Sequence, residues 1–169
     1  ISGNLVQNNT SVNDGAGIYV EGGSPIVEGN TFTANDSDDE AGGLRVKSST
    51  ASVLDNVFTS NHADYRGGAI KVSHDEITMT GNTFTGNSAW VAGGAVLLYE
   101  SASFTADNTF VDNTAEEGAA LCILAGWGGV VIEDSTFDGN IATEKGGAIY
   151  VDLPGQTTTL RRVELKNGE

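Results

Sequence analysis

Cysteine, proline and positive charge are scarce in this sequence, and each scarcity excludes a class of protein. Cys122 is the only cysteine, so no disulfide can form within the chain. Only 2 prolines accompany 23 glycines, which argues against a proline-rich linker and for tight corners in a regular framework. The 8 Lys and Arg residues against 23 Asp and Glu give a formal charge of −15, which repels nucleic acid and anionic lipid. We therefore expect no nucleic-acid partner.

Long hydrophobic runs are also missing. The most apolar stretch, residues 119–132, contains three glycines and is shorter than the roughly 20 residues that a membrane helix requires. We therefore expect no membrane insertion by this segment. The length of 169 residues suits one domain spanning 1–169. Because the first and last residues lie inside a repeat, we expect this domain to be a segment of a longer protein.

What the sequence does contain is a repeat of 26 or 27 residues. The pattern Phe-x-x-Asn occurs five times, and it is followed by Gly-Gly-Ala-Ile/Val at 67–70, 93–96 and 146–149. A third short apolar stretch closes each unit. The Asn of the pattern recurs at intervals of 26, 26, 26, 26, 27 and 27 residues, at Asn9, Asn35, Asn61, Asn87, Asn113, Asn140 and Asn167.

Three short strands per repeat, each alternating between two faces, predict a solenoid of parallel strands. Each repeat would form one coil, so that equivalent residues stack about 4.8 Å apart. Parallel crossovers are strongly biased to the right hand. The predicted fold is therefore all-β, a right-handed parallel β-helix of about six coils of 26–27 residues with three short strands per coil. A β-propeller competes with it, but its blades need roughly 40 residues or more.

This register predicts columns of identical side chains. The Phe residues are expected to stack inside, and the Asn residues to form a ladder at the following corner. Asn suits that corner because it tolerates the left-handed conformation and its amide can bond to the coils on either side. The predicted columns are Phe32, Phe58, Phe84, Phe110 and Phe137, and Asn35, Asn61, Asn87, Asn113 and Asn140, with a second Asn ladder at Asn30, Asn56, Asn82 and Asn108.

The strand after each glycine pair alternates in a way that predicts its inner and outer faces. Ile70 and Val72 should point inside, whereas Lys71 should point outside. The residues equivalent to Lys71 are mostly polar or mixed in type, which supports this phase. The positions expected outside are Tyr19, Arg45, Lys71, Leu97, Cys122 and Tyr150.

The combination of Phe-x-x-Asn with Gly-Gly-Ala-Ile resembles the repeat of the polymorphic outer-membrane proteins, a family of bacterial surface autotransporters. The resemblance runs from Asn4 to Asn167. It implies a β-helical passenger that is exposed outside the cell and used in adhesion. The implied location is extracellular or at the cell surface, and the implied partner is a surface protein or glycan of a host or neighbouring cell.

Pectin lyase-like enzymes also use this fold, so an acid–base site has to be considered. A hydrolase needs carboxylates about 5–9.5 Å apart, and a lyase needs an Arg or Lys base beside calcium. Asp107, Glu133 and Asp134 share one corner, but no His, Arg or Lys joins them in that frame. His62 and His74 lie in different corners and lack an evident acid and nucleophile. We therefore predict no catalytic residues, no enzymatic activity and no cofactor.

The corner between the Asn ladder and the glycine pair is acidic and offers the one metal candidate. Oxygen-rich turns suit calcium, but neither a Gly-Gly-x-Gly-x-Asp repeat nor an EF-hand loop is present. A solvated acidic loop is the favoured interpretation. The candidate calcium ligands are Asp36, Asp38, Asp39 and Glu40.

Two further surface features predict binding functions. Thr-x-Thr pairs such as Thr31/Thr33 and Thr83/Thr85 would form outward columns, which is typical of ice-binding solenoids, although Asp138 interrupts them. Trp90 and Trp127 lie in loops and are candidates for stacking on sugars.

The predicted function is a non-enzymatic extracellular or cell-surface repeat segment that acts as an adhesin passenger or structural stalk. A carbohydrate-binding or carbohydrate-cleaving β-helix is the alternative, and an ice-binding solenoid is a minor one. End-to-end self-association is also expected, because an end coil leaves strand backbone unpaired.

Overall fold

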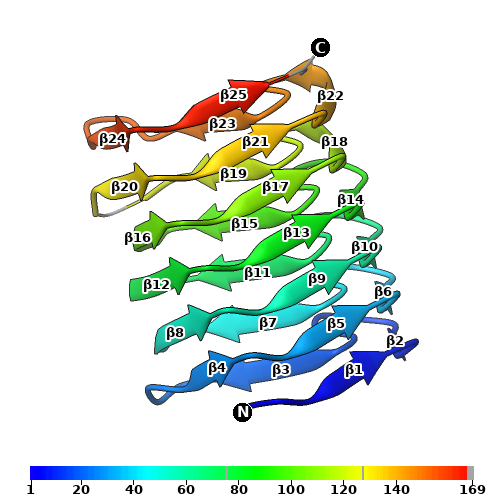
Figure 1. Cartoon of the computed structure of the whole chain (residues 1–169). Coiled ribbons are helices and arrows are strands. Elements are labelled where there is room, and N and C mark those ends of the chain that lie inside the picture. The colour runs from blue at the N-terminus through cyan, green and yellow to red at the C-terminus, as the bar shows by residue number, and fades with distance from the viewer. Residues whose placement is uncertain (75, 127, 167–169) are drawn as a thin grey trace.

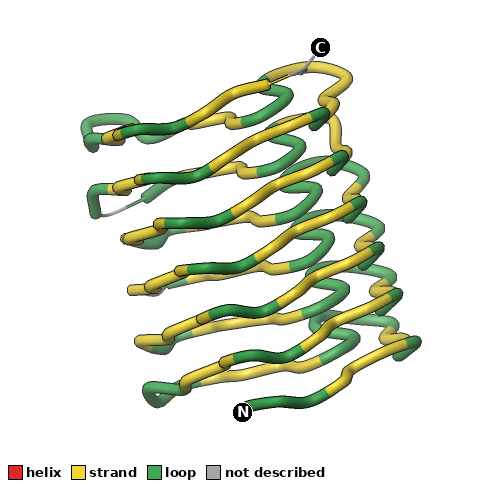
Figure 2. The backbone as a smooth tube through the Cα atoms, in the orientation of Figure 1, coloured by secondary structure: helices red, strands yellow, loops and turns green. Residues whose placement is uncertain are grey.

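The computed structural model describes residues 1–74, 76–126 and 128–166. The chain winds into a stack of coils, with the N-terminus at one end of the stack and the C-terminal coil at the other (Figure 1). Each strand pairs in parallel with its equivalent one coil away, as Phe84 pairs with Phe58 on one side and Phe110 on the other. Strands alternate with short turns along every coil (Figure 2). The predicted β-solenoid is confirmed.

Four parallel sheets form the sides of the stack. The Phe sheet contains β1 (Leu5–Gln7), β5 (Thr31–Thr33), β9 (Val57–Thr59), β13 (Thr83–Thr85), β17 (Thr109–Val111), β21 (Thr136–Asp138) and β25 (Glu164–Lys166). The corner sheet contains β2 (Thr10–Ser11), β6 (Asp36–Ser37), β10 (His62–Ala63), β14 (Ser88–Ala89), β18 (Thr114–Glu117) and β22 (Ile141–Lys145). The Gly sheet contains β3 (Ile18–Glu21), β7 (Leu44–Lys47), β11 (Ile70–Ser73), β15 (Val96–Tyr99), β19 (Leu121–Leu124) and β23 (Ile149–Asp152). The closing sheet contains β4 (Ile26–Glu28), β8 (Thr50–Leu54), β12 (Glu76–Thr80), β16 (Ala102–Ala106), β20 (Val130–Glu133) and β24 (Thr158–Arg161).

The corner sheet is the fourth strand of each coil, where the sequence predicted three. Its strands in the middle of the stack are only two residues long, such as β10 and β14. Two residues are too few to show an alternating pattern, so these strands could not be recognised from periodicity. They place a small buried residue at the corner, Ser37 in β6, Ala63 in β10 and Ala89 in β14.

The interior contains a continuous stack of phenylalanine rings. Ring centroids lie 4.6 Å apart between Phe32 and Phe58 and 5.1 Å apart between Phe58 and Phe84. The next two spacings, through Phe110 to Phe137, are 4.7 and 4.6 Å. All five rings are nearly parallel and at most 1% exposed. The spacing of the coils, close to that of paired strands, sets the distance between rings.

Beside this stack, the asparagine side chains bond from coil to coil. The Nδ2 atom of Asn61 donates to Oδ1 of Asn87 at 3.0 Å and to the carbonyl oxygen of Phe32 at 3.0 Å. The backbone N–H of Asn61 donates to the same Oδ1 at 3.0 Å. The second ladder repeats this arrangement until Asn108, whose N–H donates to the hydroxyl of Ser135 instead of to an asparagine. These amides are buried and fully used in holding the coils together.

The left-handed residue of each corner is not the ladder asparagine but the residue before it. Positive φ angles occur at Ala34 (50°), Ser60 (53°) and Gly86 (61°), each immediately before a ladder residue. The expectation that the asparagines themselves adopt this conformation is therefore wrong. The asparagine is selected by its buried amide bonds, whereas the preceding residue makes the turn.

The two glycines of each pair serve different purposes. Gly67 has a φ of 70°, in the left-handed region where a side chain is strained. A Cβ atom on Gly68 would lie 2.2 Å from the carbonyl oxygens of both Gly94 and Ser88, so close backbone packing requires glycine there. The first glycine therefore allows the turn, and the second allows the close approach of neighbouring coils.

The outward side of the Gly sheet is covered from β7 to β19, contrary to expectation, whereas Tyr19 on β3 is exposed. Leu97 and Cys122 have no exposed surface and form a second apolar cluster with Ala92, bordered by Tyr99 and Tyr150. Ala92 belongs to the chain that follows the corner sheet, and it bridges to equivalent residues of the neighbouring coils. This segment folds back over the sheet, so the residues that face away from the main core are still buried.

Charged residues at the same outward positions are buried with partners. The Arg45 Nε atom lies 3.3 Å from Asp14 Oδ2, and the ammonium group of Lys71 bonds to the carboxylate of Glu40. Burial lowers the pKa of Lys71, because the charged form loses hydration, and the bond to Glu40 opposes this shift.

Candidate functional site

The core is filled by apolar side chains and bonded amides, so any ligand has to bind to the outer faces of the sheets. Five surfaces contain the residues predicted from the sequence or newly brought together by the fold. They are the Asp107 corner, the acidic loop, the outer faces of the closing and corner sheets, and the threonine columns of the Phe sheet.

The Asp107 corner differs from the sequence prediction, because arginines join its carboxylates. Arg162 Nη2 lies 2.6 Å from Asp134 Oδ2, and Arg161 Nη1 lies 2.6 Å from Glu133 Oε1. The prediction that no Arg shares this corner is therefore wrong. Both arginines lie 28 residues beyond their partners, one residue off the regular repeat, which is why the frame did not reveal them.

The charges at this corner disfavour acid–base catalysis. The hydrogen bond from Arg162 holds the pKa of Asp134 below its usual range, so this carboxyl is ionised at neutral pH and cannot donate a proton. The same contact raises the pKa of Arg162, which therefore stays protonated and is a poor base. The contact between Arg162 and Asp134 therefore removes the first as a base and the second as a proton donor.

The acidic loop over residues 36–40 does not gather its carboxylates. Asp36 begins β6, and Glu40 is occupied by Lys71. Among the described residues, no group of three or more His, Cys, Asp and Glu side chains could hold a metal ion. Calcium binding by Asp36, Asp38, Asp39 and Glu40 stays a prediction.

A nucleophile, an imidazole and an acid meet on the corner sheet, which the sequence did not predict. His62 Nδ1 lies 2.7 Å from Ser88 Oγ, and His62 Nε2 lies 3.1 Å from Asp64 Oδ1. Ser88 and His62 occupy the same place in successive repeats, and this equivalence was the signal that could have found the contact. The side chains of His62 and Asp64 are 41% and 58% exposed, so solvent screens the acid that would have to orient the imidazole. His74 pairs elsewhere, with Glu100 at 2.6 Å.

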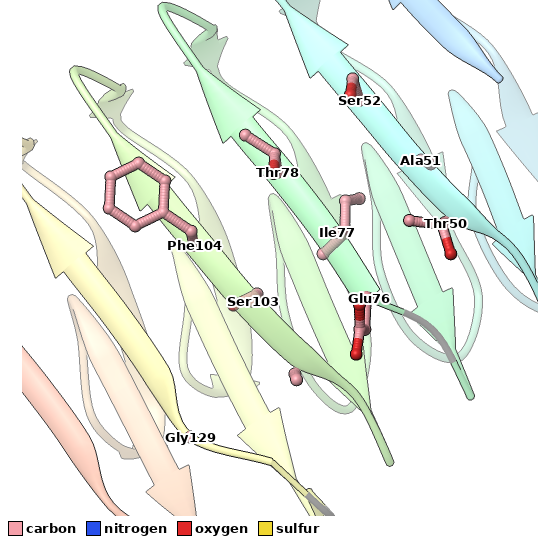
Figure 3. A pocket seen from close by; sticks show the side chains of 10 residues that line it. Thr50, Ala51, Ser52, Glu76, Ile77, Thr78, Ser103, Phe104 and Gly129 are labelled. Carbon is pink, nitrogen blue, oxygen red and sulfur yellow. The ribbon is translucent and has the colours of Figure 1, made fainter. Parts of the chain in front are cut away.

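The closing sheet carries a shallow groove of about 290 Å³ (Figure 3). Ser52, Thr78 and Phe104 lie in a row across three of its strands, with Glu76 nearer one end. The Phe104 ring is 43% exposed. The groove combines hydroxyl groups with one accessible ring, but its floor is the flat surface of the sheet.

The corner sheet carries a larger groove, of about 410 Å³, beside Trp90. Trp90 lies two residues after Ser88 and is 69% exposed. The other sequence-predicted tryptophan, Trp127, lies outside the described residues, as does Asn167. Trp90 is thus a sequence-predicted binding residue that borders an open groove.

The threonine columns lie on the outer face of the Phe sheet. Thr83 pairs with Thr109, and Thr59 pairs with both Thr33 and Thr85. The first column is interrupted by Val57, which is 40% exposed, in addition to the interruption at Asp138 in the second. Ice binding by this face stays a prediction.

Within the part of the chain that the structure describes, no helix is long and apolar enough to cross a membrane.

Comparison with protein families identifies the repeat. The model of the Chlamydia polymorphic membrane protein repeat matches residues 134–152, in agreement with the resemblance seen in the sequence and with a location at the cell surface. Comparison with curated proteins and with solved structures gave no match. The model of the right handed beta helix region matches residues 1–115, more than half of the chain, so this protein belongs to the right-handed β-helix family.

Proposed function

We propose that this chain is a non-enzymatic β-helical passenger segment at the cell surface, where it acts as an adhesin or as a structural stalk. The observation that carries the proposal is the uninterrupted axial bonding of the coils. The Phe stack and the Asn ladder run from the first coils to Phe137 and Asn140. A rod held together in this way can project from a surface while its outer faces remain free for contact.

The match to a polymorphic membrane protein repeat supports this role, because the repeat is of a structural passenger type. The formal charge of −15 gives a rod that repels its neighbours at a surface and stays soluble. Cleavage of carbohydrate is the less favoured function, since the carboxylate of Asp134 and the guanidinium of Arg162 are engaged with each other.

An adhesion assay tests the proposal. Latex beads are coated with the folded protein and offered to monolayers of cultured cells, with and without calcium. Beads coated with an unrelated acidic protein of similar charge are the control. We expect saturable retention that the soluble protein inhibits in proportion to its concentration. Retention equal to that of the control beads would contradict the adhesin role, and only the role of a structural stalk would remain.

A further inference from the structure

Trp90 presents its ring to solvent from a fixed position on the corner sheet. Its backbone N–H donates to the carbonyl oxygen of Ala63 at 3.3 Å, and its own carbonyl oxygen accepts from the N–H of Glu116 at 3.1 Å. The residue is therefore held between two neighbouring coils, although its side chain is 69% exposed. An aromatic ring that is open to solvent and carried by a fixed backbone can stack on a flat apolar surface.

The groove beside the ring has a small apolar floor and a polar rim. Ala89 and Ala115 form the floor, where side chains of only one carbon allow a ligand to approach the sheet. Thr114, Glu116 and Thr143 line the same groove, together with the exposed apolar side chain of Ile141. Hydroxyl and carboxylate oxygens can accept hydrogen bonds, and the threonines can also donate them. An apolar platform beside several hydrogen-bonding groups matches a pyranose ring, which has one C–H face and a rim of hydroxyls.

The charges around the groove select among glycans. Glu116 lines the groove, and Asp64 lies at the position equivalent to Trp90 in the preceding coil. Lys145, on β22 together with the groove residue Thr143, pairs with Glu117 at 2.5 Å. A uronate, sialic acid or sulfated sugar would approach these carboxylates against like charge, at a cost that grows as water is displaced.

We propose that the Trp90 groove binds neutral glycans, with one pyranose ring stacked on the Trp90 indole and its hydroxyls bonded by Thr114, Thr143 and Glu116. This inference rests on the proposed adhesive function and specifies the partner: a neutral surface oligosaccharide. The acidic rim makes the site selective against anionic glycans, and the solenoid fixes the backbone of the groove so that little backbone order is lost on binding.

The test is a binding titration of the whole chain, followed by tryptophan fluorescence and calorimetry. The probes are an array of neutral oligosaccharides, among them maltohexaose, cellohexaose and chitohexaose, with sialyllactose and a heparin hexasaccharide as anionic probes. We expect saturable binding of at least one neutral oligosaccharide and none of the anionic ones. Trp90→Ala should weaken that binding by about tenfold or more, and Trp90→Phe should retain part of it.

Phe104→Ala provides the matched control, since it removes an exposed aromatic ring from a different face. It should leave binding unchanged, and circular dichroism should show that all variants remain folded. No binding of any neutral probe, equal binding by Trp90→Ala, or preferred binding of an anionic probe would each overturn the inference.

The outcome can be separated from that of the adhesion assay. If beads coated with Trp90→Ala are retained on cells as well as beads coated with the parent protein, the adhesive function is supported, and the proposal that the Trp90 groove binds the adhesive partner is wrong. If the parent binds neutral oligosaccharides but its beads are not retained, the groove stands and the adhesive function is wrong.

Discussion

The side-chain amide of Asn61 lies 3.0 Å from Oδ1 of Asn87, its equivalent one coil further along. The same amide nitrogen donates to Phe32 in the preceding coil, and Oδ1 of Asn61 accepts from the amide of Asn35 at 2.9 Å. One buried side chain therefore joins three coils and satisfies backbone groups that the turn would otherwise leave without partners.

Asn87→Ala tests this role. The substitution leaves several buried groups without partners, among them the carbonyl oxygen of Phe58 and the N–H of Asn61. Each orphaned group costs about 1–3 kcal/mol, so we expect a total loss of roughly 3 kcal/mol or more in the free energy of unfolding. Asn9→Ala, at an exposed position of the same ladder, should cost clearly less. Chemical denaturation of both variants measures the difference, and equal losses would contradict the ladder.

Phe84→Ala tests the ring stack. The ring is fully buried between Phe58 and Phe110, so its removal leaves a cavity in the middle of the core. We expect a loss of about 3–5 kcal/mol in the free energy of unfolding. Phe104→Ala, on the surface, should change it by no more than about 0.5 kcal/mol. A Phe84→Ala variant as stable as the parent would show that the register is wrong.

A reciprocal pair of substitutions tests the left-handed corners. Ala34 and Gly86 occupy the same place in different coils, with φ angles of 50° and 61°. Ala34→Gly should stabilise the fold by about 0.5–1 kcal/mol, because glycine is not strained there, and Gly86→Ala should destabilise it by a similar amount. A Cβ on Gly86 has no atom closer than 3.9 Å, so steric overlap does not confound the comparison. Thermal unfolding of the two variants should therefore shift in opposite directions, and shifts in the same direction would refute the assignment.

Cys122 predicts a dependence on alkaline pH. Burial raises the pKa of its thiol to about 12. The unfolded chain, whose thiol has an ordinary pKa near 9, loses its proton first, so this group contributes stability below about pH 9 that is lost as the pH rises towards 12. Cys122→Ala should remove this part of the pH slope.

The same burial can be measured by thiol labelling. At pH 8 a thiol-reactive dye should leave the native protein unmodified and label it fully after denaturation. Rapid labelling of the native chain would show that the segment around Ala92 does not cover the Gly sheet.

The repeat made the solenoid predictable, because the residues that form each column recur in the sequence at a nearly constant interval. Phe84 and Asn87 could be assigned to interior columns from their copies alone. The burial of Leu97 and Cys122 could not, since the segment that covers them varies from coil to coil and its path is set by packing. Their alternation correctly indicated that they face away from the core, but facing away did not mean exposure.

The candidate surfaces were less predictable, for a related reason. Trp90 could be singled out by its residue type, but its groove depends on the small side chains of neighbouring coils. The contact between His62 and Ser88 required the register to be applied to polar residues as well. The position of Arg162 beside Asp134 could not be predicted, because its coil departs by one or two residues from the regular spacing of the repeat.

Product analysis shows whether the protein binds oligosaccharides without cleaving them. The protein is incubated at neutral pH with labelled neutral oligosaccharides and with polygalacturonate, with and without calcium, and the sugars are analysed by mass spectrometry. We expect that at least one neutral oligosaccharide is retained by the protein and recovered at its original length, and that polygalacturonate is neither retained nor shortened. Shortened products that disappear in an Asp134→Asn or Arg162→Gln variant would contradict this expectation and assign catalysis to that corner.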